Sequence, residues 1–211
     1  SFRYRLYPTK AQAATLTAWL ELTRELYNAA LQERRDAWKK KHVSVTKFDQ
    51  MRVLPAVREV RPEFRDIPIV VLRGALRRLD KAFQGFFRRV KAGAAAAGYP
   101  RFKARERYQS LLLDDLGPKS PLVGKKVAIP LLGTVNVKLH RPVEGVPKAL
   151  RLTRDAGGRW FATFACVDVP AKPLPTCEAD AGIDLGLNAF VALSDGSLEG
   201  NPRVARGARL P

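Results

Sequence analysis

An aspartate between two glycines is the most promising candidate for chemistry in this chain. Asp184 lies in the run Ala181-Gly182-Ile183-Asp184-Leu185-Gly186-Leu187, where strand alternation predicts Ile183 and Leu185 facing a core and Asp184 facing away. The flanking glycines would let a metal ion or a phosphate approach the backbone closely. Three interpretations stay open from these residues alone: a metal-binding carboxylate, a turn or capping residue, and the first phosphate loop of an actin-like ATPase or sugar kinase.

A basic helical face is the first candidate for binding a polyanion. The apolar spacing predicts a helix from about Ile69 to Lys91, with one apolar stripe and a separate cationic sector that contains no acidic residue. Each cation could neutralise a phosphate and release its counterion. The plainer interpretation is a solvated helix face. The cations of this sector are Arg73, Arg77, Lys81, Arg88 and Lys91.

The second candidate is the stretch Tyr99–Tyr108, in which aromatic and basic residues interleave. On a strand, the basic residues would point to one side and Phe102 to the other, so that cations follow a backbone while aromatic rings pack or stack on bases. A charge-guarded edge strand is the plainer interpretation. With both stretches together, the candidate nucleic-acid-binding residues are Arg73, Arg77, Lys81, Arg88, Arg89, Lys91, Tyr99, Arg101, Lys103, Arg105 and Arg107.

The composition supports a polyanionic partner. The 211 residues contain 38 Lys and Arg against 20 Asp and Glu, a formal charge of +18, and residues 1–107 hold 25 of these basic residues against 10 acidic ones. A hydrophobic content of 46% is ample for a core, and no apolar run is long enough to span a membrane. Two cysteines, Cys166 and Cys177, suit neither a zinc ribbon nor a disulfide framework, so we expect a reducing, cytoplasmic location.

The elements that would position these residues change from helices to strands along the chain. Alternation predicts a strand over 2–7, and Thr9 with Gln12 has the spacing of a capping box that opens a long helix ending near Lys41. A loop with Pro55, Pro62 and Pro68 and a flexible Ala/Gly joint over 93–98 flank the second helix. Short strands follow over 126–130, 134–139, 150–153 and 160–167, as a small antiparallel barrel or sheet, and a hairpin covers 182–196.

Taken in order, several short motifs of this chain resemble those of the TnpB proteins encoded by bacterial insertion sequences, which are related to type V CRISPR effector nucleases. The resemblance covers nearly the whole chain. The motifs are Arg5-Leu6-Tyr7-Pro8, Tyr27-Asn28-Ala29-Ala30-Leu31, Ala75-Leu76-Arg77-Arg78-Leu79 with Phe86-Phe87-Arg88-Arg89-Val90-Lys91, Gly98-Tyr99-Pro100-Arg101-Phe102-Lys103, Ile129-Pro130-Leu131-Leu132-Gly133-Thr134-Val135, and Gly182-Ile183-Asp184-Leu185-Gly186 with the turn Asp195-Gly196.

The resemblance implies an α+β architecture. It predicts an oligonucleotide-binding-like wedge β-barrel formed by residues 1–8 and 98–176, interrupted by a helical recognition insert over 9–97. Residues 177–211 would begin a RuvC nuclease domain of the RNase H-like fold with its first β-hairpin. We expect both ends of the chain to be cut, because Ser1 is not a native start and residues 200–211 stop without a closing element.

The resemblance also implies an activity, a metal and partners. The complete protein would be a bacterial, cytoplasmic, RNA-guided DNA endonuclease that binds a guide RNA and double-stranded target DNA, as a monomer or dimer on one RNA. Asp184 would be the first of three carboxylates that hold two Mg²⁺ ions, with a Zn²⁺ ribbon in a later segment. One carboxylate cannot hold both ions, so we expect the 211-residue chain alone to be inactive.

Two alternatives to a nuclease stay open from the sequence. A nuclease-dead relative could use guided DNA binding to repress transcription, and a truncated chain could bind nucleic acid without any further activity. Asp184 argues for the nuclease against the first alternative, because a protein that only binds has no need of a metal-binding carboxylate.

Overall fold

The structure is a computed structural model that describes residues 1–114, 116, 120–173, 181–186 and 188–201. The chain divides into a larger unit, residues 1–170, and a smaller one, residues 171–211. The predicted boundary at 176/177, together with Cys177, lies outside the described residues. Among the described residues, no helix combines the length and the apolar composition that crossing a bilayer requires.

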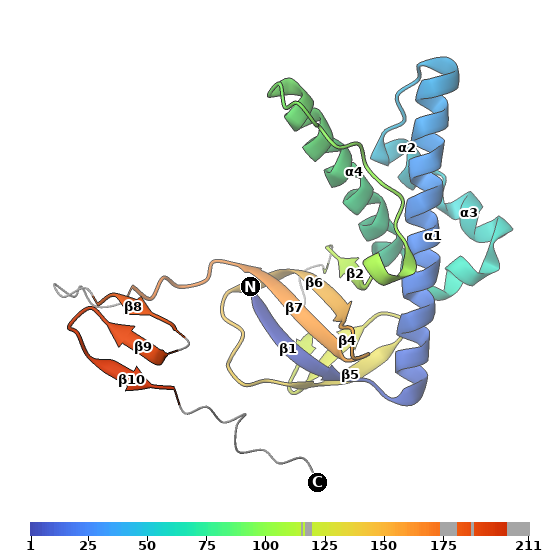
Figure 1. The fold of residues 1–211 in the computed structure, drawn as a ribbon. Helices are drawn as coiled ribbons and strands as arrows, with labels where there is room; N and C mark the ends of the chain where they lie inside the picture. The colour runs from blue at the N-terminus through green and yellow to red at the C-terminus, as the bar shows by residue number, and fades with distance from the viewer. Residues whose placement is uncertain (115, 117–119, 174–180, 187, 202–211) are drawn as a thin grey trace, which may run out of the picture. The chain divides into compact units, whose positions relative to one another are not determined.

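A seven-stranded antiparallel sheet organises the larger unit, in the order β2-β6-β7-β1-β5-β4-β3 (Figure 1). The first strand, β1 (Phe2–Tyr7), lies inside this sheet, paired with β7 on one side and β5 on the other. Its alternation is as predicted, because Phe2, Tyr4 and Leu6 are buried. The other strands are β2 (Ser110–Leu113), β3 (Leu122–Val123), β4 (Lys126–Ile129), β5 (Gly133–Lys138), β6 (Val146–Arg154) and β7 (Trp160–Val167).

The strand pairing has a topological consequence for the helices. Both neighbours of β1 come from the far half of the chain, with Leu6 opposite Val137 on one side and opposite Trp160 on the other. Every helix from Lys10 to Lys91 is therefore an insertion between the first strand and the strands that complete its sheet. Within the described residues the sheet ends at β2 and β3, so the hydrogen bonding is that of a sheet, and a wedge barrel stays a prediction.

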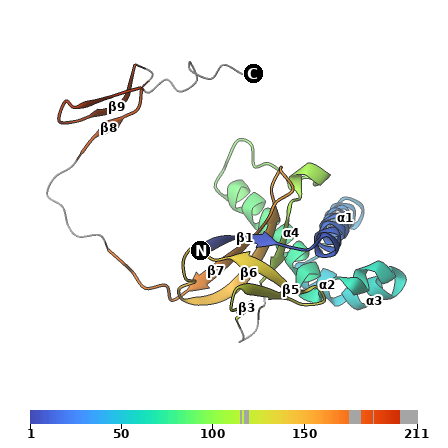
Figure 2. The ribbon, with the colours of Figure 1, turned by 90° about the horizontal axis from the view of Figure 1, so that it is seen from below.

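Two long helices have the bounds that the sequence predicts. In α1 (Lys10–Lys41) the capping box is present: the Gln12 backbone N–H donates to Thr9 Oγ1 at 3.2 Å, and the Thr9 N–H donates to Gln12 Oε1 at 3.1 Å. The second long helix, α4, spans Ile69–Lys91 and packs against α1 and β2. Viewed from below, α1 is seen nearly along its axis, beside the sheet (Figure 2).

The proline-rich stretch between these helices is not a loop, and that prediction was wrong. It forms α2 (Lys47–Arg52), α3 (Leu54–Val60) and the 3₁₀ helix η1 (Pro62–Asp66). Pro55 and Pro62 occupy the first turns of α3 and η1, where the missing N–H would have no helical partner in any case. Proline therefore marks helix starts here.

The smaller unit holds a three-stranded antiparallel sheet, in the order β10-β9-β8. The predicted hairpin is present as β8 (Ile183–Asp184) paired with β9 (Ala189–Leu193). A third strand, β10 (Leu198–Gly200), follows the Asp195-Gly196 turn and was not predicted. Whether this sheet begins a RuvC domain stays a prediction.

A single glycine allows the close approach of α4 to the sheet. Gly74 is buried against β2, and a Cβ atom at this position would overlap the backbone carbonyl oxygen of Leu112. Gly85, on the same helix, is open: the nearest heavy atom to an added Cβ is Arg89 Nη1, at 3.4 Å. The two glycines therefore differ in what they permit, although both lie in a helix interior.

We expect Gly74→Ala to lower the free energy of unfolding by about 1–3 kcal/mol, because the backbone of β2 must move to admit the methyl group. Gly85→Ala, the matched control, is expected to raise it by about 0.5–1 kcal/mol through helix propensity. Urea denaturation followed by circular dichroism measures both. Equal effects of the two substitutions would contradict the close packing of α4 on β2.

Candidate nucleic-acid interface

A cleft lined by five cations lies between α4 and the segment that returns from it. Its volume is about 450 Å³, and no carboxylate is among its lining residues. We call it the cationic cleft. It joins two stretches that the sequence singled out separately, the basic helix face and the Tyr99–Tyr108 stretch. The lining residues are Tyr27, Lys81, Ala82, Gly85, Arg88, Arg89, Gly98, Tyr99, Pro100, Arg101 and Lys103.

The helical wall of the cationic cleft follows from residue spacing. Lys81, Gly85 and Arg88 are four and three residues apart, so they share one face of α4, and glycine leaves the floor between the two cations open. Lys81 and Arg88 are exposed and form no ion pair with a carboxylate in the described part of the chain. Arg89 is different, because its guanidinium donates to the carbonyl oxygens of Ala97 and Gly98 and so ties the end of α4 to the returning segment.

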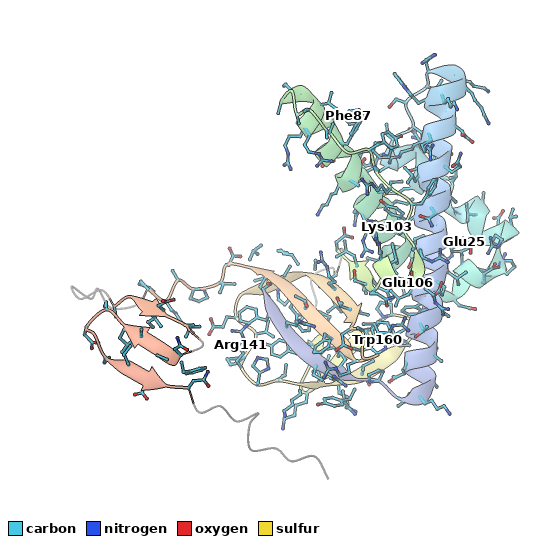
Figure 3. All side chains as sticks on the ribbon, in the orientation of Figure 1. Glu25, Phe87, Lys103, Glu106, Arg141 and Trp160 are labelled. Carbon is cyan, nitrogen blue, oxygen red and sulfur yellow. The ribbon has the colours of Figure 1, made fainter. Side chains whose placement is uncertain are left out.

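The opposite wall is the returning segment, residues 98–104, which Figure 1 shows running from α4 back toward the sheet alongside α1. Asn28 of α1 holds its backbone with two hydrogen bonds: Nδ2 donates to the Lys103 carbonyl at 3.0 Å, and the Lys103 N–H donates to Oδ1 at 2.8 Å. Tyr99 packs edge-on against Phe83 and Phe86 of α4. Lys103, labelled in Figure 3, therefore lines the cleft from a backbone that α1 fixes.

This geometry corrects the prediction that the Tyr99–Tyr108 stretch is a strand. Residues 98–104 have no regular secondary structure, and Arg105–Arg107 form a 3₁₀ turn, η2. The physical reason is that the backbone partner of the segment is the Asn28 side chain and not a neighbouring strand. Strand alternation consequently does not decide where the basic side chains point.

The structure separates the remaining predicted residues from the cleft. Arg77 forms an ion pair with Asp114, and Arg105 Nε forms one with Glu21 Oε1 at 2.5 Å, so both cations have internal partners. The other three are exposed but are not among the lining residues of the cationic cleft: Arg73, Lys91 and Arg107. The predicted residues that the structure brings together are Lys81, Arg88, Arg89, Tyr99, Arg101 and Lys103.

The electrostatics of the cationic cleft favour an anionic ligand. Five positive charges line about 450 Å³ with no acidic side chain to offset them, so their mutual repulsion falls when phosphates enter. Partial burial raises the pKa of the Tyr99 hydroxyl, although the guanidinium groups of Arg35 and Arg34 act in the opposite direction. The phenol is therefore protonated at neutral pH and can donate a hydrogen bond to a phosphate oxygen.

The sequence reasoning missed Asn28 and Tyr27 as site residues. Asparagine is a poor residue for a helix interior because its side chain competes for backbone hydrogen bonds, so its presence on the packed side of α1 signalled a partner. Tyr27 lines the cleft and its ring centroid lies 6.0 Å from that of Tyr108. The partners of Asn28 and Tyr27, which are Lys103 and Tyr108, lie 75 or more positions further along the chain, and no local pattern reveals such contacts.

Asp184 lies on β8 in the smaller unit, opposite Ala192 of β9. The prediction that Ile183 and Leu185 face a core was wrong, because their exposed fractions are 67% and 70%. Glu199 of β10 pairs with Val191, the residue before Ala192. Its side chain therefore points to the face of the sheet opposite that of Asp184. Among the described residues, no group of three or more His, Cys, Asp and Glu side chains could hold a metal ion. Asp184 can therefore supply one carboxylate, which does not by itself fit a two-metal site.

Comparison with known proteins connects this chain to mobile-element proteins. A family described as a helix-turn-helix domain, of the IS605 OrfB type, matches residues 1–42. In this structure the same residues form one strand, β1, and one continuous helix, α1, so the matched segment contains no second helix.

Two curated relatives match almost the whole chain. The "Putative RNA-guided DNA endonuclease" of Streptomyces pristinaespiralis is 31% identical over 99% of this chain and 51% of its own length. The "Putative RNA-guided DNA endonuclease InsQ" of Escherichia coli (strain K12) is 23% identical over 94% of this chain and 48% of its own length. The chain thus spans about half the length of these relatives. A solved CRISPR-Cas12f ternary complex aligns with 85% of this chain and 46% of that chain, at 10% identity and a TM-score of 0.46.

These sequence matches relate the chain to transposon-associated proteins, and the names of the two relatives describe RNA-guided DNA endonucleases. They confirm the predicted relationship to the TnpB family.

We expect Asn28→Ala to lower the free energy of unfolding by about 1–3 kcal/mol, because it leaves the Lys103 N–H and carbonyl without their partner. It should also speed tryptic cleavage after Arg101 and Lys103, measured by mass spectrometry of early digests. Gln32→Ala, one turn further along α1, is the control, because Gln32 is exposed and its side chain donates a hydrogen bond to Asp36 of the same helix. Unchanged cleavage at these two sites in Asn28→Ala would show that the returning segment is held by other contacts.

Proposed function

We propose that this chain forms the nucleic-acid-binding part of an RNA-guided DNA endonuclease of the TnpB family, binding a guide RNA and target DNA. The observation that carries the proposal is the cationic cleft, in which five cations from two separate stretches face one space without a carboxylate. The relationship to the TnpB family supports the guide and the target as the anions. Base pairing between them would supply sequence choice, while the protein contacts backbone and shape.

Within this proposal the cleft acts on phosphates and not on base edges. Arg88 and Arg101 approach from opposite walls, so a strand lying in the cleft would meet a guanidinium on each side. Arginine forks match phosphate oxygens in pairs, and Lys81 adds a point charge on the helical wall. Such contacts position a strand and provide affinity at any sequence.

Asp184 would contribute to cleavage as one carboxylate of a larger site. Mg²⁺ is a hard cation that prefers carboxylate oxygens, and a bound pair of such ions would polarise a phosphodiester and activate water. Among the described residues Asp184 belongs to no group of three or more metal-ligating side chains, so further carboxylates would have to come from elsewhere in the protein. We further propose that the 211-residue chain alone does not cut DNA, and that any Zn²⁺ ribbon belongs to a different segment.

Removing one cleft cation should change the salt dependence of RNA binding. We expect Arg88→Gln to reduce the slope of log K against log salt concentration by about 0.7–0.9, because one counterion fewer is released. Arg52→Gln is the control, since Arg52 is also an exposed helix arginine, on α2 and outside the cleft, where it lies 3.9 Å from Asp49. Filter binding of a cognate guide RNA at several salt concentrations measures the slopes. A wild-type affinity that does not respond to salt would overturn the proposed phosphate binding.

In the full-length protein, Asp184→Asn should abolish guide-directed DNA cleavage, with at least a 100-fold loss expected when a metal-binding carboxylate is replaced. Guide RNA affinity should stay within about twofold, because Asp184 lies outside the cationic cleft. Glu199→Gln is the matched control, a carboxylate of the same small sheet that faces the other side. Undiminished cleavage by Asp184→Asn would remove Asp184 from the site. Guided binding by a wild-type protein that never cuts would favour the repressor alternative.

A further inference from the structure

A second cavity, which the proposed function does not use, lies between the far ends of α1 and α4. Its volume is about 320 Å³, within the range of about 300–1,000 Å³ typical of pockets for small ligands. We call it the aromatic pocket. Its residues are Arg34, Trp38, Val43, Ser44, Val45, Phe83, Phe86, Phe87 and Tyr99.

Two rings of the aromatic pocket are exposed although they lie at the apolar spacing of the two long helices. Trp38 and Phe87 continue the apolar stripes of α1 and α4, yet each side chain is 59% exposed. Figure 3 shows Phe87 near the end of α4 that is distant from the sheet. The two helices lie closest to each other near the sheet (Figure 1). Their apolar stripes therefore continue beyond the region where the helices are in contact. Large apolar groups that are left in water at one location mark a binding surface.

The exposed rings are held in place by buried neighbours. Phe83 is 7% exposed and lies in a stacked arrangement with Phe87, at a centroid distance of 6.2 Å. Phe86 contacts Phe87 at 5.1 Å and Tyr99 at 5.2 Å. A ring fixed in this way loses little conformational entropy when a flat ligand stacks on it.

The charge around the aromatic pocket decides what kind of ligand fits. The nearest acidic groups are already paired: Asp36 with Lys40, and Asp80 with Arg34 and Lys47. A second copy of the chain placed on this face would bring two cationic rims together, which is repulsive. A ligand that is anionic and also carries flat apolar groups satisfies both the rim and the rings. By the rim we mean the cations in the last turns of the two helices that carry Trp38 and Phe87, which are Lys39, Lys40, Lys41, Arg88, Arg89 and Lys91.

We propose that the aromatic pocket binds an unpaired base of an RNA strand whose phosphates lie in the cationic cleft. The two sites are adjacent, because Tyr99 is a lining residue of both. Duplex DNA buries its bases, whereas RNA loops and ends present bases that stack on aromatic and arginine side chains. This inference rests on the proposed function for its phosphate contacts, and it adds a base-stacking site that distinguishes single-stranded from duplex RNA.

The test compares wild type with Phe87→Ala and Trp38→Ala in binding a short single-stranded RNA that carries a fluorescent adenine analogue, and in binding the same RNA as a duplex. We expect each variant to bind the single strand about tenfold more weakly, in the range found for base-stacking positions, and to lose the fluorescence quenching that stacking causes. Duplex binding and the salt slope should stay unchanged, because the cleft cations are intact. Phe87→Tyr should restore both readouts, and Val60→Ala, an 80% exposed apolar residue of α3, is the control.

The outcomes separate this inference from the proposed function. A wild-type chain with no salt-dependent RNA binding overturns both. Normal wild-type binding with unchanged Phe87→Ala and Trp38→Ala affinities overturns the stacking site alone, as does an equal loss for single strand and duplex. Tighter binding of the single-stranded DNA version than of the RNA overturns the choice of RNA. A wild-type dimer in sedimentation that Phe87→Ala dissociates would identify the aromatic pocket as a protein contact and overturn the proposal.

Discussion

The hydrogen bonds between Asn28 and Lys103 fix the segment on which both candidate sites depend. A backbone that leaves α4 with no strand to join needs partners for its polar groups, and the Asn28 amide supplies a donor and an acceptor together. With Lys103 fixed to α1, Arg101 faces Arg88 across the cationic cleft, and Tyr99 reaches the phenylalanines of α4. Without this contact the basic residues of the segment would not be held opposite the basic residues of α4.

The allocation of acidic residues explains why the cationic cleft is unopposed. Carboxylates near the helices are engaged elsewhere: Asp80 with Arg34 and Lys47, Asp114 with Arg77, and Glu21 with Arg105. The pairs of Asp80 and Asp114 hold α4 to α1, α2 and the segment after β2, where partial burial makes an unpaired charge costly, and the Glu21 pair joins α1 to η2. Four of the five cleft cations are exposed and Lys103 is half-buried, so their repulsion costs the fold little and favours an anionic ligand. The basic residues of this chain are thus divided between ion pairs within the fold and an unopposed cleft.

Local signals predicted the regular elements well and the irregular ones poorly. The capping box at Thr9 and the apolar spacing of α4 involve residues three or four positions apart, so helix ends could be placed from the sequence. The returning segment was assigned to a strand because alternation alone cannot say whether a partner strand exists. Prolines 55 and 62 were assigned to a loop, although they begin α3 and η1, because proline both ends and starts helices.

By itself, the sequence determined the net charge, the two long helices, the alternating strands and the relationship to the TnpB family, because each rests on composition, short-range spacing or ordered motifs. Only the tertiary structure decided which cations face a ligand. Arg77 and Arg88 have the same character in the sequence, yet one meets Asp114 and the other the open cationic cleft. The tertiary structure likewise left Trp38 and Phe87 largely exposed, because the ring contacts of each come from residues near it in sequence and not from the other long helix.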